Sequence, residues 1–266
     1  MTLYFLGGGN MAAAIIGRLR QHRPELPIHV ANRGAEKRGR LAAQFGVAVS
    51  EKLPVLTEGD ILVLAVKPQD MQAACSDIQT GGALVLSVAA GLDTGTLAQY
   101  LGGSRRIIRC IPNTPCAVGE GVTGLFAAEG VSEADRSLAQ SIMQACGITL
   151  WLEQEEQLHG LTGISGSGSA YVFYLMAALA EAARRQGFDG QQARLLSLAT
   201  FKGAVALAEQ SGEDFTVLEQ NVTSKGGTTA AALEVFRRKN TEDIIAEGAA
   251  ACVRRSREIA AQFKNT

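Results

Sequence analysis

The sequence predicts an α/β protein with two domains, an N-terminal doubly wound, mainly parallel sheet and a C-terminal domain made only of helices. Short apolar runs alternate with helical patterns up to about residue 153, and no convincing strand follows. The runs at 61–66 and 83–88 are apolar on both faces, which is typical of parallel strands covered by helices on both sides. We therefore expect the domains at residues 1–153 and 154–266.

The first half is expected to be built from βαβ units, because its strands and helices are interleaved. The expected strands are Thr2–Leu6, Ile28–Ala31, Ile61–Val66, Ala83–Val88 and Arg106–Ile111, with Val122–Ala127 and Thr149–Leu152 extending the same sheet. The expected helices are Asn10–Gln21, Ala35–Phe45, Gln69–Asp77 and Glu133–Ala145.

The second half is expected to form four main helices, Ser169–Gln186, Gly190–Gln210, Thr228–Arg238 and Thr241–Gln262. The first of them is apolar nearly all round over Tyr171–Leu179. A helix that is apolar on every side must be buried on every side, and a small helical domain cannot bury it alone. We therefore expect this half to be a dimerisation domain that packs against a second copy, in a homodimer or a higher assembly of dimers.

Composition excludes several classes of protein. The formal net charge is −1, without the basic excess that is typical of nucleic-acid binding. The five cysteines are widely spaced and the three histidines scattered, so we expect no metal site and free thiols in a reducing cytoplasm. No signal peptide is visible, and the longest uncharged apolar run, residues 170–180, is too short to span a bilayer, so no membrane partner is expected.

A glycine-rich turn follows the first expected strand and opens the first expected helix. Its residues, Gly7-Gly8-Gly9-Asn10-Met11-Ala12, fit the pattern G-x-G-x-x-A. In this pattern the glycines allow a tight turn and close approach of the backbone to a pyrophosphate, which binds free N–H groups at the positive end of the helix. Because the strand and helix context is right, we expect a Rossmann-type dinucleotide site rather than a structural turn.

The end of the second strand distinguishes NADP from NAD. Enzymes that use NAD usually carry a carboxylate there for the ribose hydroxyls, whereas this chain has Asn32 and Arg33, with Lys37 close behind. A 2′-phosphate would pair well with Arg33, supported by Asn32. The alternative is a set of solvated charges at the start of a helix. We predict a preference for NADPH.

A second anion site is expected in the helical half. Thr223-Ser224-Lys225-Gly226-Gly227-Thr228-Thr229 precedes an alanine-rich helix, and a helix N-terminus with two glycines and several hydroxyls can bind a carboxylate. The alternative for any one hydroxyl is an ordinary N-cap. A similar stretch, residues 165–169, lines the same pocket or lets helices pack closely, and the sequence leaves both open.

The usual machinery for reducing a ketone is missing. The chain has no Tyr-x-x-x-Lys pair, and Ala170 stands where related oxidases of 3-hydroxy acids place a lysine. A ketone needs an electrophile to polarise its oxygen as hydride arrives, whereas a protonated imine already carries positive charge. The absence favours an imine substrate.

Six segments together resemble the pyrroline-5-carboxylate reductase family, nearly end to end: Phe5–Ala12, Ala65–Gln69, Ser87–Gly91, Arg109–Pro115, Leu161–Tyr171 and Asn221–Thr229. The last resembles the family signature most closely, although it has Lys225 where many members have proline and Thr228 where alanine is frequent.

The resemblance implies an enzyme that reduces 1-pyrroline-5-carboxylate to L-proline with NADPH, the last step of proline biosynthesis. It implies cofactor contacts at Leu6, Gly7, Gly8, Gly9, Asn10, Met11, Asn32, Arg33, Ala65, Val66, Lys67, Pro68, Val88, Ala89, Ala90, Asn113 and Pro115. It implies substrate contacts at Ser224, Gly226, Gly227, Thr228 and Thr229, and it places Asn221 and Glu155 near the substrate. Thr229 is the catalytic candidate, as the residue that would contact the ring nitrogen.

Two other functions stay open at this point. One is a reductase of the same fold that acts on another cyclic imine or a 3-hydroxy acid. The other is a non-catalytic regulator that uses the dinucleotide site as a sensor. The second carboxylate-binding turn argues against a sensor, which needs no such turn.

Overall fold

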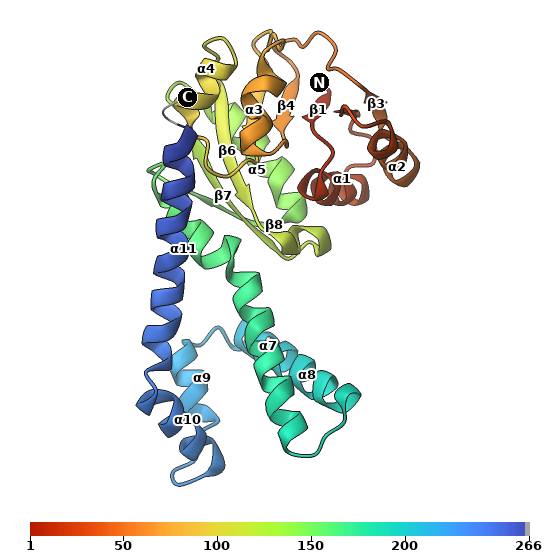
Figure 1. Ribbon diagram of the computed structural model, residues 1–266. Coiled ribbons are helices and arrows are strands. Elements are labelled where there is room, and N and C mark those ends of the chain that lie inside the picture. Colours follow the sequence, from red (N-terminus) through yellow and green to blue (C-terminus); the bar gives the residue numbers. More distant parts are fainter. Residues whose placement is uncertain (264–266) are drawn as a thin grey trace. The chain divides into compact units, whose positions relative to one another are not determined.

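The computed structural model describes residues 1–263, and its N-terminal part is one twisted sheet with helices on both faces (Figure 1). The strands are β1 (Leu3–Leu6), β2 (Ile28–Ala31), β3 (Ala48–Ser50), β4 (Ile61–Leu64), β5 (Leu84–Ser87), β6 (Ile107–Pro112), β7 (Gly121–Ala127) and β8 (Gly147–Trp151). They lie in the order β3-β2-β1-β4-β5-β6-β7-β8, and within this sheet only the β6–β7 pair is antiparallel.

The register of the parallel strands brings their carboxyl ends to one edge of the sheet. Leu6, the last residue of β1, is aligned with Leu64, the last residue of β4, and Leu64 is aligned with Ser87, the last residue of β5. The loops that follow these strands therefore emerge side by side. In doubly wound sheets this edge is where ligands bind.

Each face of the sheet has its own hydrophobic core. Helices α1 (Asn10–His22), α2 (Ala35–Phe45) and α5 (Glu133–Met143) cover one face, and α3 (Pro68–Cys75) and α4 (Thr94–Tyr100) cover the other. Alternate residues of β1 serve the two cores, because Phe5 packs with the first set and Leu6 with the second. Burial of a side chain such as Leu62 or Ile15, both fully buried, contributes about 1.5–3 kcal/mol.

Four short helical turns complete this part of the chain. The turn η1 (Thr114–Val118) joins β6 to β7, and η2 (Gln144–Cys146) joins α5 to β8. The turn α6 (Gln157–Leu161) and the π-helical turn η3 (Thr162–Gly166) lead from β8 to the long helices. The long helices are α7 (Gly168–Arg185), α8 (Gly190–Ser211), α10 (Thr228–Arg238) and α11 (Thr241–Phe263), with the shorter α9 (Phe215–Asn221) between α8 and α10.

Helices α7 and α8 form an antiparallel pair with an exposed apolar surface. A capping box begins α8, in which Asp189 accepts from the N–H of Gln192 at 2.8 Å and Gln192 accepts from the N–H of Asp189 at 3.1 Å. The hydroxyl of Ser197 ties the pair together by donating to the carbonyl of Met176 at 2.8 Å. Large apolar side chains nevertheless face solvent in this single chain, among them Phe173, Tyr174, Leu175, Leu179, Leu195 and Leu198.

The chain groups into two compact units. One holds residues 1–167 together with the described residues from Ala251 onward, and the other holds residues 168–250. This grouping differs from the division at residues 153 and 154 expected from the sequence, because η3, α6 and the end of α11 pack with the sheet. The predicted fold class, a mainly parallel Rossmann-type sheet followed by a helical domain, is confirmed.

Candidate functional site

The glycine-rich turn after β1 is shaped so that only glycine fits its first position. Gly7 has φ +99°, and a Cβ atom there would lie 2.7 Å from the carbonyl oxygen of Ala65. A Cβ on Gly8 would lie 2.5 Å from Leu41 Cδ1. Gly9 is the N-cap of α1 and has no side chain to cap it, so the first N–H groups of that helix are free to bind an anion.

The loop after β2 is tied to this turn by Asn32. The Asn32 side-chain oxygen accepts from the N–H of Gly8 at 3.3 Å, and its amide nitrogen donates to the carbonyl of Gly34 at 3.2 Å. The guanidinium of Arg38 donates to the carbonyls of Asn32 and Arg33 at 2.6 and 2.8 Å. The backbone of the expected 2′-phosphate loop is therefore held from both sides, and the Arg33 side chain itself is exposed.

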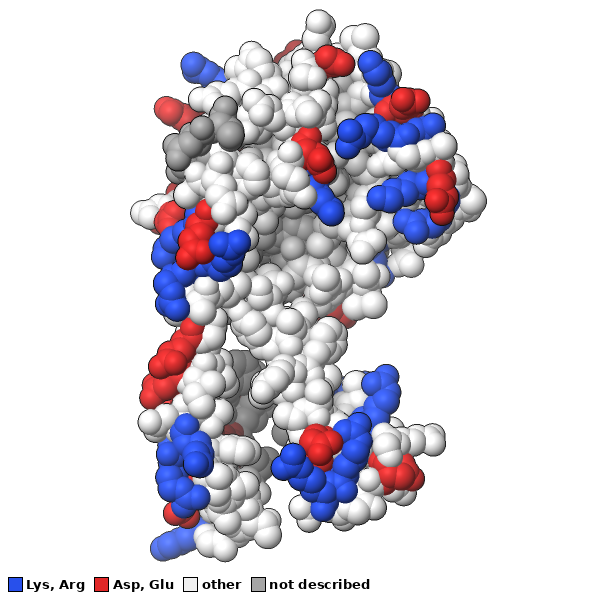
Figure 2. All heavy atoms as spheres, in the orientation of Figure 1, with Lys and Arg blue, Asp and Glu red and all other residues white. Residues whose placement is uncertain are grey.

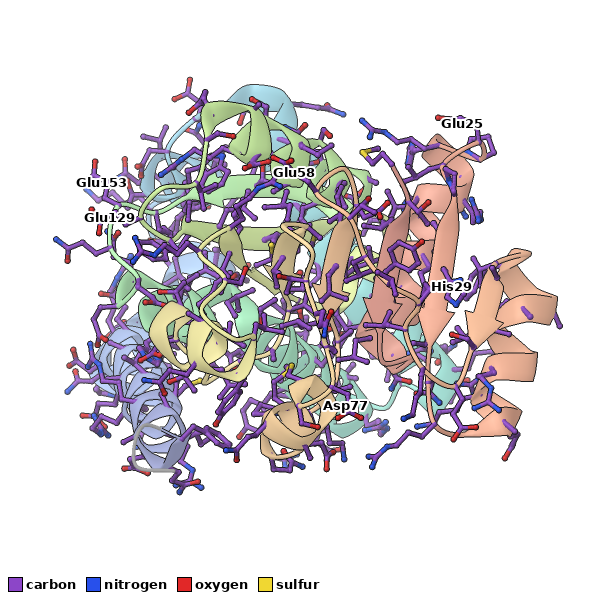
Figure 3. All side chains as sticks on the ribbon, turned by 90° about the horizontal axis from the view of Figure 1, so that it is seen from above. Glu25, His29, Glu58, Asp77, Glu129 and Glu153 are labelled. Carbon is purple, nitrogen blue, oxygen red and sulfur yellow. The ribbon has the colours of Figure 1, made fainter. Side chains whose placement is uncertain are left out.

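A cleft of about 780 Å³ lies along the turn and this loop. Of the predicted cofactor residues it is lined by Leu6, Gly7, Gly8, Gly9, Asn32, Arg33, Ala65, Val66 and Lys67. Residues 51–55, which no sequence motif marked, also form part of its wall, and so does Lys37, which follows Arg33 closely in the sequence. At the rim, Lys52 pairs with Asp77 at 3.7 Å, and Figure 3 labels Asp77 beside α3.

The remaining predicted cofactor residues lie near the same edge of the sheet without lining this cleft. Asn10 and Met11 begin α1, Pro68 begins α3, and residues 88–90 follow β5. Asn113 follows β6 and is 7% exposed. Its oxygen accepts from the N–H of Val122 at 2.8 Å and its amide donates to the carbonyl of Ser165 at 3.1 Å, so this side chain fixes the start of η1, which contains Pro115.

Glu155 is held by three donors within the sheet-containing unit. Its carboxylate accepts from the N–H and the hydroxyl of Thr94 at 2.8 and 3.1 Å and from Arg109 at 3.0 Å. With Arg109 it lines a separate hollow of about 360 Å³. Glu155 thus links residues Thr94 and Arg109 of the sheet-containing unit. Its predicted place near the substrate stays a prediction.

The predicted carboxylate site is a second helix N-terminus without a side-chain cap, in the other unit. Gly227 is the N-cap of α10 with extended backbone, and Gly226 before it has φ +70°. Ser224 Oγ lies beside Gly227, since a Cβ on Gly227 would come within 2.3 Å of it. Thr228 and Thr229 occupy the first turn of α10, and Asn221 is the last residue of α9.

Basic and acidic side chains are interspersed over the face drawn in Figure 2. Four basic side chains line the cofactor cleft: Arg33, Lys37, Lys52 and Lys67. Glu51, Asp70 and Asp77 line the cleft as well, so its excess is one positive charge. Two of the cations, Arg33 and Lys37, come from the loop after β2 and the first turn of α2, where a phosphate would pair with them. A search of the described residues finds no cluster of three or more His, Cys, Asp or Glu side chains that could hold a metal ion.

A Rossmann-type sheet with a glycine turn, a free helix N-terminus and cations on the loop after β2 defines a dinucleotide-dependent oxidoreductase. Family models agree with this class. Residues 2–91 match a family described as "NADP oxidoreductase coenzyme F420-dependent", and residues 155–259 match one described as "Pyrroline-5-carboxylate reductase dimerisation".

Relatives along nearly the whole chain identify the family. The chain is 38% identical over 264 residues to a pyrroline-5-carboxylate reductase of Pseudomonas aeruginosa and 39% identical over 265 residues to that of Haemophilus influenzae, with 97% of both chains covered in each case. Among solved structures, a pyrroline-5-carboxylate reductase from Coxiella burnetii has a TM-score of 0.88 at 35% identity, covering 97% of this chain and 98% of that one. One from Plasmodium falciparum, solved with NADP bound, has a TM-score of 0.84 at 25% identity, covering 98% of both chains. The chain belongs to the pyrroline-5-carboxylate reductase family, NADP-dependent oxidoreductases of proline biosynthesis.

One helical stretch of the described residues, Gln157–Arg185, is long and apolar enough to cross a membrane by length and composition alone. Only 11% of its most apolar window is buried in the single chain. The same stretch lies within the matched dimerisation model, residues 155–259.

Proposed function

We propose that this chain reduces 1-pyrroline-5-carboxylate to L-proline with NADPH. The observation that carries the proposal is the uncapped N-terminus of α10 at Gly227, which follows the hydroxyl of Ser224 and a glycine with φ +70°. Free N–H groups and hydroxyls bind a carboxylate, and the substrate of this reaction is a small cyclic imine with one carboxylate.

The cofactor site fits NADPH on its own residues. The cradle at Gly7 leaves no room for a Cβ, the N-terminus of α1 has no side-chain cap, and Arg33 and Lys37 line the cleft beside the loop after β2. We propose that the N–H groups of this turn hold the pyrophosphate, that Arg33 and Lys37 hold the 2′-phosphate, and that Asn32 positions their loop. When bound, the cofactor supplies the hydride.

The chemistry asked of the protein is mainly positioning. The turn at Ser224, Gly226, Gly227, Thr228 and Thr229 holds the carboxylate, and Thr229 contacts the ring nitrogen. That nitrogen carries its proton when the imine binds, so no buried acid is needed to polarise the bond. Residues 88–90, Asn113 and Pro115 line the nicotinamide end, and Asn221 and Glu155 lie near the substrate.

We also propose that the chain works as a homodimer or a higher assembly of dimers, in the cytoplasm. The exposed apolar side chains of α7 and α8, such as Phe173 at 65% and Tyr174 at 76%, supply the surface that a second copy would cover. A monomeric mass in light scattering at micromolar concentration contradicts this assembly.

Thr229→Ala tests the substrate site. Loss of a hydrogen bond to a charged group removes about 1–3 kcal/mol, so kcat/KM for pyrroline-5-carboxylate falls roughly tenfold or more. Ser211→Ala is the matched control, because it removes an exposed hydroxyl at the end of α8 that donates to the carbonyl of Ala208 and accepts from the N–H of Glu213, both at 3.3 Å. Equal kcat/KM for Thr229→Ala and Ser211→Ala removes Thr229 from the site.

A further inference from the structure

The side chain of Asn113 joins two segments that are far apart in the sequence. Its oxygen accepts from the N–H of Val122 at 2.8 Å, and its amide nitrogen donates to the carbonyl of Ser165 at 3.1 Å. Val122 lies at the start of β7, and Ser165 lies in the π-helical turn η3. Because Asn113 is 7% exposed, the bridge is largely shielded from water. One amide therefore links the connection between β6 and β7 to η3.

On the β6 side, this residue closes the loop that contains η1. The last residue of β6, Pro112, is paired with Thr123 in the antiparallel ladder and has no N–H to donate. The bond from the Val122 N–H to the Asn113 side chain holds the two strands together one residue beyond this pair. The carbonyl of Asn113 also accepts from the N–H of Cys116 at 3.2 Å. Backbone and side chain of Asn113 thus fix both the start of η1 and the end of its loop.

The turn η3 has an unusual geometry that hydrogen bonds from side chains support. The N–H of Ser167 donates to the carbonyl of Thr162 at 2.9 Å, five residues back, whereas an α-helix pairs residues four apart. The hydroxyls of Thr162 and Ser165 each donate to a carbonyl four residues back, at 2.7 and 3.2 Å. Single π-helical turns are rare and occur frequently at functional sites. With the bond from Asn113, this turn is held both from within and from the end of β6.

We propose that Asn113 is a positioning residue, which locks η1 to η3 and so sets where Pro115 and the Asn113 backbone meet the nicotinamide. The nitrogen and the oxygen of its side chain each have a partner inside the protein, so the side chain acts on the cofactor through η1 and not by contact. The catalytic consequence rests on the proposed function, whereas the bridge itself does not.

Hydride transfer is sensitive to such a lock. The reacting carbons must be held about 3–3.5 Å apart in the right orientation, and a misplacement of about 1 Å costs about 100-fold in rate. The cleft at the other end of the cofactor is lined by Gly7 and Arg33, while Asn113 and Pro115 do not line it. Release of η1 therefore changes the rate of hydride transfer more than the affinity for NADPH.

Asn113→Ala removes the bridge. We expect kcat to fall about 10- to 100-fold while KM for NADPH changes less than about threefold. We also expect a larger isotope effect on kcat with NADPH deuterated at the transferred position, because hydride transfer becomes slower. Gln140→Ala is the matched control, since it removes another half-buried amide, whose oxygen accepts from Trp151 Nε1 at 2.8 Å. This control is expected to lose stability but to keep kcat and its isotope effect.

Asn113→Asp keeps an acceptor for Val122 and makes the bond to Ser165 depend on pH. The introduced carboxyl donates to the Ser165 carbonyl only when it is protonated, and burial raises its pKa above the usual value of about 3.9. We therefore expect kcat of this variant, relative to the wild type, to rise as the pH falls, while the ratio for Asn113→Ala stays constant. A ratio for Asn113→Asp that does not change with pH overturns the donor role of the Asn113 amide.

Hydrogen–deuterium exchange of the full-length protein without ligands tests the bridge apart from the reaction. In Asn113→Ala, the amide hydrogens of residues 114–122 and 162–167 are expected to exchange on the order of tenfold faster, and those of β1 and β4 at the wild-type rate. Unchanged exchange in both segments overturns the bridge, and faster exchange with wild-type kcat overturns the positioning role. An equal loss of kcat and of NADPH affinity indicates direct contact and overturns the proposal as well. A wild-type chain that does not turn over 1-pyrroline-5-carboxylate refutes the proposed function, and the exchange rates still decide the bridge.

Discussion

Replacing Arg33 with alanine tests how the chain recognises the 2′-phosphate. Arg38 holds the carbonyl of Arg33 at 2.8 Å, so the substitution removes the side chain while the loop stays in place. A hydrogen bond to a charged group contributes about 1.5–3 kcal/mol. Arg33 is exposed and Lys37 also lines the cleft, so we expect the lower part of that range, about 1.5–2 kcal/mol, or about 10- to 30-fold in KM for NADPH.

Steady-state kinetics with both cofactors is the assay for Arg33→Ala. We expect KM for NADPH to rise and kcat/KM with NADH to stay unchanged, because NADH has no 2′-phosphate. Arg40→Ala is the matched control, since Arg40 is an exposed cation of α2 outside the residues that line the cleft. An equal loss with both cofactors, or none with NADPH, refutes this assignment of Arg33.

Three further predictions concern stability and the cradle. Gly7→Ala places a Cβ at φ +99° and 2.7 Å from the carbonyl oxygen of Ala65, so we expect a lower Tm and roughly tenfold weaker NADPH binding. Gly9→Ala is the control and is expected to keep the wild-type Tm, because nothing lies within 4 Å of a Cβ there. Equal Tm values for the two variants in thermal scans contradict this reasoning. Two hydrogen bonds from Arg106 hold the pKa of Asp135 below its usual value. This carboxylate therefore stabilises the fold at pH values above its pKa in the unfolded chain, about 3.9, and the stabilisation is lost as the pH falls through its lower pKa in the folded protein. Asp135→Asn therefore lowers the free energy of unfolding at pH 7 by about 1–3 kcal/mol and weakens its dependence on pH. Denaturant melts at several pH values check this, and a free energy of unfolding that varies with pH as in the wild type contradicts it. Glu155→Gln removes the carboxylate that pairs with Arg109, whose side chain is 4% exposed, so we expect the free energy of unfolding in urea to fall by about 3–5 kcal/mol. Unchanged stability together with a raised KM for the imine would instead assign Glu155 to the substrate site.

The sequence was sufficient for the layered fold because its strands are strongly patterned. The runs that became β4 and β5 are buried at every position, as two-sided apolar runs predict. Strand β3, three residues long, was missed because its pairing with β2 gives no periodicity to detect. Helices α4 and α9, seven residues each, were also missed, although Asp93 and Asp214 cap them and were the available signals.

The parts of the candidate site that are formed by a local sequence motif could be predicted. Contacts between residues far apart in the sequence could not. The glycine turn and Arg33 follow from local order, and the structure places both in one cleft. The contacts of Glu155 with Thr94 and Arg109 join residues 61 and 46 positions apart, and no local pattern announces them.

Oxidation of NADPH in the presence of pyrroline-5-carboxylate tests the central claim most directly. The account predicts NADPH oxidation that depends on the imine, yields proline in equal amount, and exceeds by a wide margin the turnover of other cyclic imines or of a 3-hydroxy acid with NADP. A chain that binds NADPH but turns over none of these compounds is a non-catalytic NADP-binding protein, and that result contradicts the account.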